Sequence, residues 1–175
     1  MVTQRPEIPE PEDYGHKEVF SFFGLASYTA QVMEKGLLIL AVALKLSGVK
    51  KITRHIVDQL FERMGTKTCG RLIKICQEEN IFSKTEHEKI DYALNKRNWL
   101  THHYFYDNAE DFYSLNGRTK MIHELQEMIA LFDDTDNIVH NLGVIYWEKH
   151  GVTQSIIDNE LNNMITKAKN KYDAI

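Results

Sequence analysis

The chain has 175 residues, which is enough for one domain with a sizeable core and too short for two ordinary domains. Hydrophobic residues make up 43% and charged residues 26% of the chain, a balance that excludes a disordered or fibrous protein. The net charge of -4 excludes attraction of nucleic acid to the whole surface, so any polyanion must bind a local patch.

The beginning of the chain is predicted to be an arm followed by a long helix. Residues 1–15 hold all three prolines of the sequence, so we expect a flexible, unpacked arm there. Residues 16–175 are expected to form a single domain. Dense apolar residues over 17–47, ending at Ser47 and Gly48, predict one long central helix. The few prolines and glycines favour an all-α bundle.

Capping residues and apolar periodicity predict further helices over residues 53–64, 69–79, 83–105, 118–150 and 153 onward. Thr68 is the expected N-cap of the second of these, and Ser83 with Glu86 fits a Ser-x-x-Glu capping box. The acidic run 133–136 could divide the long fourth helix in two. The last helix carries an apolar stripe, formed by Ile156, Ile157, Leu161, Met164 and Ile165.

Cysteine spacing and the lack of targeting segments bear on the compartment. Cys69 and Cys76 lie seven positions apart in a predicted helix, about 10 Å along its axis, which is too far for a disulfide. Reduced thiols favour a cytoplasmic protein. No basic segment followed by an apolar run opens the chain, so we expect no secretory signal. The most apolar stretch, 36–46, is far shorter than the roughly 20 residues of a membrane span, and we expect a core helix.

The predicted helix 83–105 has an arginine in its core-facing stripe. The stripe is formed by Ile90, Ala93, Arg97, Leu100 and Tyr104. A guanidinium group does not lose its charge, so Arg97 must be paired where it is buried. The long first helix carries a narrow polar stripe of Ser27, Gln31 and Glu34, and Glu34 is the expected partner of Arg97.

A second face of the same helix combines an amide with an imidazole. Asn98 and His102 are i, i+4 neighbours, and the long Arg97 side chain can reach toward them. One groove can therefore hold a cation, an amide and a titratable imidazole. His103 falls on a different face, closer to Trp99. Spacing alone also fits a simpler interpretation, in which these residues are ordinary polar groups on a packed helix.

Other kinds of site have little support in the sequence. His102 and His103 are adjacent and diverge on a helix, unlike the i, i+4 histidines that share a metal. The acidic run 133–136 lacks the spaced ligands and the glycine of a calcium loop. Phosphate-binding glycine loops and nucleophile elbows are absent from the sequence. We therefore expect no metal and no cofactor.

The segment "RNWLTHHYF" resembles the signature of the HEPN (higher eukaryotes and prokaryotes nucleotide-binding) superfamily. That signature is an arginine, a polar residue and a histidine after four to six intervening positions, and Arg97, Asn98 and His102 fit it. The segments "GLASYTAQVMEKGLLIL" and "DFYSLNGRTKMIHELQEM" are similar to those that flank this motif in bacterial HEPN-like proteins. The resemblance covers roughly residues 20–131.

The resemblance implies an α-helical bundle that commonly dimerises, with two motif helices placed together. Many members are metal-independent endoribonucleases, often toxins or phage-defence factors, and an antitoxin or associated defence protein is then a partner. Others bind nucleotides or proteins without cleaving anything. Carried over to this chain, the resemblance makes Arg97 and His102 the catalytic pair and Asn98 an orienting or substrate-contacting amide. From their positions in the sequence, Glu34, Gln31, His103 and Tyr104 are expected to support this site.

Two functions follow as alternatives. In the first, a homodimer cleaves single-stranded or loop RNA without a metal, because RNA carries its own nucleophile in the 2'-hydroxyl group. His102 transfers protons, Arg97 stabilises the phosphate, and pairing two motifs supplies both a base and an acid. In the second, the protein is a non-catalytic dimerisation, interaction or nucleotide-binding module, in which the Arg97–Glu34 pair and His102 order the bundle and its interface.

Overall fold

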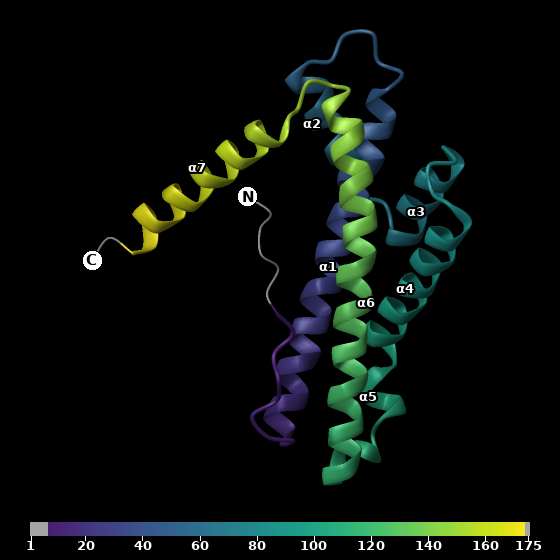
Figure 1. Ribbon diagram of the computed structural model, residues 1–175, viewed down its shortest axis with the longest axis vertical. Coiled ribbons are helices and arrows are strands. Elements are labelled where there is room, and N and C mark those ends of the chain that lie inside the picture. The colour runs from purple at the N-terminus through teal and green to yellow at the C-terminus, as the bar shows by residue number, and fades with distance from the viewer. Residues whose placement is uncertain (1–6, 174–175) are drawn as a thin grey trace.

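The computed structural model describes residues 7–173 of the chain (Figure 1). Over this range it contains seven α-helices, one short 3-10 helix and no strand, which confirms the predicted all-α fold class. Two long helices form the centre of the bundle, the shorter helices cover one side of this pair, and the last helix projects away from it.

The central pair consists of α1 (His16–Leu46) and α6 (Leu115–Glu148), which run side by side in the same direction. At one end the Arg118 side chain donates a hydrogen bond to the carbonyl oxygen of Tyr14, and at the other the His150 ring bonds the carbonyl oxygen of Ala43. Because parallel helices cannot be joined by a short turn, residues 47–114 form a long crossover between them.

The crossover contains four helices and a 3-10 turn: α2 (Arg54–Gly65), α3 (Cys69–Glu78), α4 (Lys84–His102), α5 (Tyr104–Asp107) and η1 (Asp111–Tyr113). The predicted caps are confirmed for α3, where the Thr68 hydroxyl accepts from the Arg71 amide, and for α4, where Ser83 and Glu86 form the capping box. The helix predicted to reach Phe105 instead ends at His102, because the backbone leaves the helical conformation at His103 (φ -130°).

The acidic run 133–136 does not divide α6, which continues to Glu148. Phe132 and Thr135 are fully buried, and the Thr135 hydroxyl donates to the carbonyl oxygen of Leu131 at 2.7 Å. The acidic side chains lie on the other faces, where Asp134 pairs with Lys89 of α4. Burial of one face therefore keeps the helix continuous through a segment of low helix propensity.

The core divides into two hydrophobic clusters along the central pair. One lies between α1, α2, α3, the first part of α4 and the later part of α6, and includes Leu37 and Ile90. The other lies between the first part of α1, the end of α4 and the first part of α6, and includes Met33 and Ala93. Glu34 lies in the sequence between Met33 of the second cluster and Leu37 of the first. The predicted ion pair therefore falls where the two clusters meet.

The arm differs from its prediction over residues 7–15, which are packed against the bundle. Ile8 and Tyr14 contact the second cluster, and the Gln126 side chain donates to the carbonyl oxygen of Pro9 at 3.0 Å. Proline lacks an N–H donor but keeps its carbonyl acceptor, so an extended proline-rich segment can still be held by side chains of a helix. The rest of the predicted arm, residues 1–6, lies outside the described residues.

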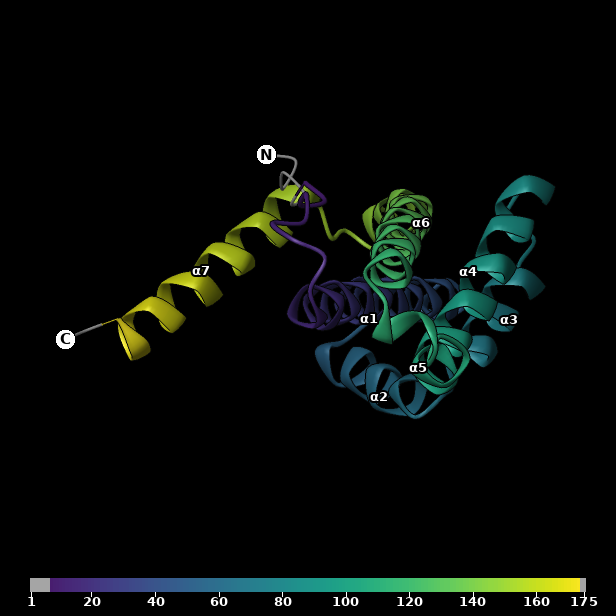
Figure 2. The same cartoon turned by 90° about the horizontal axis from the view of Figure 1, so that it is seen from below.

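The last helix, α7 (Gln154–Tyr172), leaves the bundle after Gly151 (Figures 1 and 2). Its predicted apolar stripe is present, and every member of the stripe is exposed. Across residues 7–173, none of the helices combines the length and the apolar character needed to cross a membrane.

Candidate functional site

The site is built on an ion pair between the central helix and the motif helix. The Arg97 Nε atom of α4 contacts the Glu34 carboxylate of α1, which confirms the predicted partnership. The Arg97 side chain is 28% exposed and that of Glu34 is 22% exposed, so the pair is half-buried rather than sealed in the core. Arg97 therefore joins two helices and keeps part of its guanidinium group accessible.

Asn98 contacts the other side of the same guanidinium group. The Arg97 Nη1 atom donates to the Asn98 side-chain oxygen at 3.1 Å, and the Thr101 hydroxyl donates to the Arg97 carbonyl oxygen at 2.9 Å. A guanidinium group carries five N–H donors in a fixed plane. Two contacts orient this plane and leave further donors for an anionic group.

Cys69, at the start of α3, lies near the ion pair and was not predicted to belong to the site. The pKa of its thiol is raised to about 12, mainly by burial and also by the Glu34 carboxylate, while Arg97 acts in the opposite direction. Cys69 is therefore a neutral thiol packed beside the ion pair. Sequence spacing between α3 and α4 carries no signal for this proximity, which depends on how the crossover folds.

Two histidines lie at the end of the motif helix. His102 is the last residue of α4 and His103 follows it, and both side chains are exposed. Their ring centroids are 6.3 Å apart, with the planes at 71°. Within residues 7–173, no hydrogen bond or ion pair joins His102 to Arg97 or Asn98. The structure thus places two accessible imidazoles at the carboxyl end of a helix.

The turn that follows the histidines is fixed by Trp99. Its indole N–H donates to the Asp107 carboxylate at 2.6 Å, across the break between α4 and α5. The Trp99 ring also meets the Tyr104 ring edge to face, with centroids 5.2 Å apart. These contacts hold the position of the His102 and His103 backbone. Asp107 was not predicted as part of the site, because its contact with Trp99 depends on the helix break at His103.

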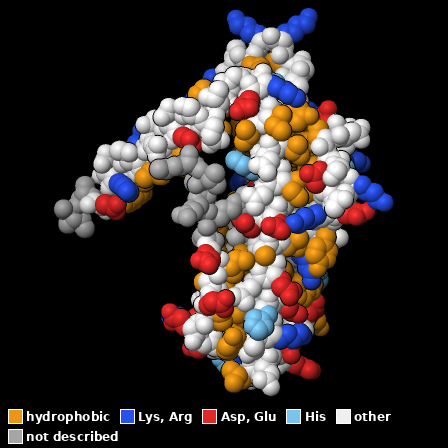
Figure 3. Space-filling view, in the orientation of Figure 1, with side chains coloured by type: hydrophobic (Ala, Val, Ile, Leu, Met, Phe, Trp, Pro, Cys, Tyr) orange, Lys and Arg blue, Asp and Glu red, His pale blue; other side chains and the backbone are white. Residues whose placement is uncertain are grey.

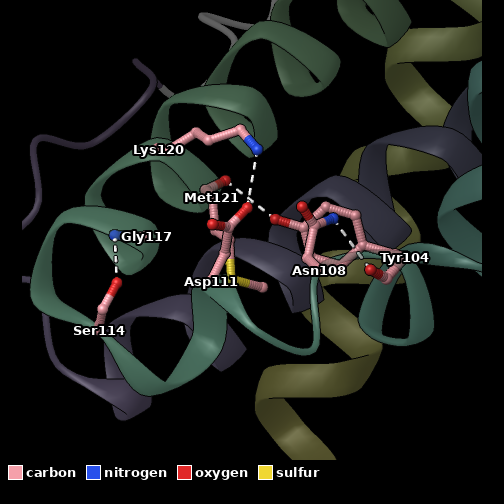
Figure 4. A network of polar contacts seen from close by, with 7 residues as sticks. All are labelled: Tyr104, Asn108, Asp111, Ser114, Gly117, Lys120 and Met121. Atoms are coloured by element: carbon pink, nitrogen blue, oxygen red, sulfur yellow. Dashed lines mark hydrogen bonds and ion pairs between the residues drawn. The ribbon is translucent and has the colours of Figure 1, made fainter.

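Tyr104 is a structural anchor rather than an exposed site residue. Its side chain is 1% exposed, and its hydroxyl donates to the carbonyl oxygen of Met121 at 2.9 Å (Figure 4). The Asn108 side chain donates to the carbonyl oxygen of Tyr104 at the same distance. Burial raises the pKa of Tyr104, and the nearby Glu124 and Asp111 carboxylates raise it further. Tyr104 therefore supports the motif by tying its end to α6.

A second set of contacts in Figure 4 closes the connector onto the beginning of α6. The Ser114 hydroxyl accepts from the Gly117 amide at 3.0 Å, and the Lys120 ammonium contacts the Asp111 carboxylate at 2.7 Å. A Cβ atom at Gly117 would lie 2.1 Å from the Asp111 carbonyl oxygen, so only glycine fits there. The segment after the motif is thereby held rigidly against the central pair.

Aromatic side chains from α1 and the connector pack beside this end of the motif. Phe105 follows the two histidines and lies 5.6 Å from Phe20 and 6.0 Å from Phe112, measured between ring centroids. Phe20 is more than half exposed. The surface next to the motif therefore carries an accessible aromatic ring.

One predicted site residue does not join the others. Gln31 is exposed and lines a groove between α1 and α6, whereas Glu34 faces α4. A spacing of three residues places two side chains on neighbouring parts of a helix surface, and here the boundary between two partner helices runs between them. Gln31 therefore belongs to a different surface from the motif.

No three His, Cys, Asp or Glu side chains come together as a potential metal site in the part of the chain that the structure describes. Comparison of the chain with known protein families, with curated proteins and with solved structures gave no match in any of the three.

Proposed function

We propose that this protein is a metal-independent endoribonuclease of the HEPN type that cleaves single-stranded or loop RNA. One observation carries the proposal: an arginine whose plane is oriented by Glu34 and Asn98 lies on the same short segment as the two exposed imidazoles of His102 and His103. A fixed cation and a proton-transfer group at one helix end are the two elements that RNA cleavage requires.

The chemistry uses the substrate's own nucleophile. An imidazole removes the proton of the 2'-hydroxyl group, and the 2'-oxygen then attacks the adjacent phosphorus. The bond from phosphorus to the 5'-oxygen breaks, and that oxygen takes a proton from an imidazolium group. The products are a 2',3'-cyclic phosphate and a 5'-hydroxyl end. The Arg97 guanidinium stabilises the charge that grows on the phosphate oxygens during the attack.

His102 is the residue to which we assign proton transfer, because it follows Asn98 by one helical turn and its side chain is exposed. One imidazole does not readily serve as both base and acid within one turnover. We therefore propose a homodimer in which two Arg97 to Tyr104 segments share a cleft, so that each site receives two imidazoles. Exposed Phe20 beside the motif offers a surface on which an unpaired base can stack.

The non-catalytic module remains the second candidate, and a specific observation favours it. Arg97 already has a carboxylate partner in Glu34, which is how a purely structural arginine would be arranged. In this alternative the segment mediates dimerisation or binds a partner, and nothing is cleaved. The two free, buried cysteines suit a reducing cytoplasm in either case.

The decisive experiment incubates purified protein with a labelled RNA hairpin in the presence of EDTA. Wild-type protein is expected to cleave the loop and leave 2',3'-cyclic phosphate ends. Phosphatase removes this phosphate only after acid has opened the cyclic ester, so treatment with and without acid identifies these ends. His102→Ala should reduce the rate about 100- to 10,000-fold, the range expected for loss of a general acid or base. Circular dichroism should show unchanged helix content.

His103→Ala is the matched control, because it removes the neighbouring imidazole from the next position. Its rate should fall less than that of His102→Ala. Equal losses in the two variants would show that both imidazoles transfer protons. Intact wild-type protein that cleaves no RNA, whether hairpin or single strand, would overturn the nuclease in favour of the non-catalytic module.

A further inference from the structure

An apolar groove of about 500 Å³ runs between α1 and α6. Its lining includes Tyr28, Val32 and Ile39 from α1 and Val144 and Trp147 from α6, and most of its surface is apolar. Tyr28, Val32 and Ile39 are among the exposed large hydrophobic residues of the chain. No residue of α4 lines it, because the motif helix packs on another side of the central pair (Figure 2).

The helix α7 has the complementary feature, an apolar stripe that is exposed among the residues that the structure describes. Ile157, Leu161, Met164 and Ile165 follow the i, i+4, i+7, i+8 pattern of a helix face that normally meets a core. All four are exposed, Met164 by 66%. Figure 3 shows hydrophobic side chains along this projecting helix. Of the α7 residues, Ile157 alone lines the groove.

The direction in which α7 leaves the bundle is fixed by the end of α6. Gly151 has φ +80°, its amide donates to the carbonyl oxygen of Glu148, and the Val152 amide donates to that of Trp147. This left-handed glycine cap closes the helix. The His150 ring, bonded to the Ala43 carbonyl oxygen at 3.0 Å, fastens the same turn to α1. The exit therefore points α7 away from the groove of its own chain beyond Ile157.

We propose that two copies of this chain exchange their α7 helices, so that the apolar stripe of each α7 fills the α1–α6 groove of its partner. Each copy offers the α1–α6 groove and the exposed α7 stripe, so reciprocal exchange fills both and gives a closed, twofold-symmetric pair. The occupant of the groove is thus α7 from a second copy of the chain.

The stripe fits the groove in length, and the end of the groove carries a carboxylate. The stripe from Ile157 to Ile165 is about 12 Å long and the α6 side of the groove, from Asp136 to Trp147, is about 16 Å long, at 1.5 Å per residue. With the two helices antiparallel, Lys167, Lys169 and Lys171 follow the stripe and come near Asp136, the residue of the acidic run that lines that end of the groove. The attraction between these lysines and Asp136 favours the antiparallel orientation.

The exchange is independent of the proposed nuclease activity. It buries the side of the central pair that faces away from α4, so the Arg97 to Tyr104 segment stays accessible in the exchanged pair. A chain that cleaves no RNA can still exchange α7, and a chain without exchange can still carry a working motif.

Cysteine cross-linking tests the exchange. Val32→Cys, in the groove, and Ile165→Cys, on α7, are placed on separate chains that differ in size by a tag, and the two chains are co-expressed. A short bis-maleimide is expected to give a product with the summed mass of the two chains. Wild-type protein controls for Cys69 and Cys76, which are buried and should not react. Absence of a cross-link between the chains would overturn the proposal.

A single chain that carries both Val32→Cys and Ile165→Cys tests whether α7 instead closes on the groove of its own chain. A cross-link within one chain, at the mass of a single copy and independent of concentration, would show that α7 closes on its own groove, and would overturn exchange. Light scattering provides a second measurement. Leu161→Glu should halve the mass of the particle, whereas Asn159→Glu, on the opposite face of α7, should leave it unchanged.

Discussion

Glu34 of α1 and Arg97 of α4 form an ion pair at the junction of the two hydrophobic clusters of the bundle. The contact ties the candidate motif to the helix that makes the most extensive contacts in the fold. It therefore affects both the stability of the bundle and the orientation of the guanidinium group.

Replacing Glu34 by Gln should lower the free energy of unfolding by about 1.5 to 3 kcal/mol, because a half-buried guanidinium group loses its charged partner. A fully buried pair would lose more, and the partial exposure of both side chains reduces the effect. Urea denaturation followed by circular dichroism measures the change. Glu88→Gln is the control, since its ion pair with Lys84 is exposed and should contribute less than about 0.5 kcal/mol. Similar losses of unfolding free energy in both variants would contradict a stabilising role for the Glu34–Arg97 pair.

Cys69 and Cys76 should resist alkylation by iodoacetamide in the folded protein at pH 8, and react once the chain is unfolded. Burial raises the pKa of each thiol from 9.0 to about 12, so neither forms the reactive thiolate at this pH. Mass spectrometry after timed labelling measures the extent of modification. Rapid labelling of native protein would show that the thiols are accessible.

The same shifts give a pH dependence of stability. The folded state retains thiol protons that the unfolded chain loses above pH 9.0. Below that pH both states are protonated, and the contribution of the thiols to the stability of the folded state is complete. It should decrease as the pH rises from about 9 toward 12. Urea midpoints at pH 8 and pH 10 measure the loss, and Cys76→Ala should make the dependence shallower. A midpoint that stays constant between these values would rule out the effect.

Replacing Tyr104 by Phe should destabilise the protein by about 0.5 to 1.5 kcal/mol, because the buried hydrogen bond from its hydroxyl group to the Met121 carbonyl oxygen is lost. Thermal unfolding monitored at 222 nm, a standard wavelength for helix signals, measures the change. Tyr106→Phe is the matched control, since that side chain is 86% exposed and its variant should be close to wild type in stability. A neutral Tyr104→Phe would mean that the hydroxyl does not anchor the motif.

Tyr106→Glu should separate copies that pair through the motif, because a new carboxylate beside its symmetry mate would repel it. Tyr106 lies just beyond the Arg97 to Tyr104 segment and is exposed, so the single chain should fold normally. Combined with Leu161→Glu, the variant should be monomeric by light scattering, while each single variant keeps one of the two interfaces. A Tyr106→Glu single variant with unchanged mass would exclude the motif interface.

The sequence predicted what depends on local spacing. Helix caps at Thr68 and Ser83 were recognisable because one hydroxyl and one or two backbone amides suffice. The contact between Glu34 and Arg97 followed from the requirement that a charge in an apolar stripe be paired. Packing between distant segments was not predictable in this way. Residues 7–15 were expected to be unpacked, and Gln31 was expected near the motif. The structure differs in both places, because the position of each depends on which helix lies alongside.

The parallel arrangement of α1 and α6 has a consequence for synthesis on the ribosome. The apolar face of α1 emerges first, but its main partner follows only after residues 47–114 have been translated. Until then the nascent chain exposes the buried residues of its longest early helix, which is the condition under which chaperones are recruited and aggregation begins. Closing so long a loop also slows the step that joins the two helices, so refolding should be slower than in bundles of adjacent antiparallel helices.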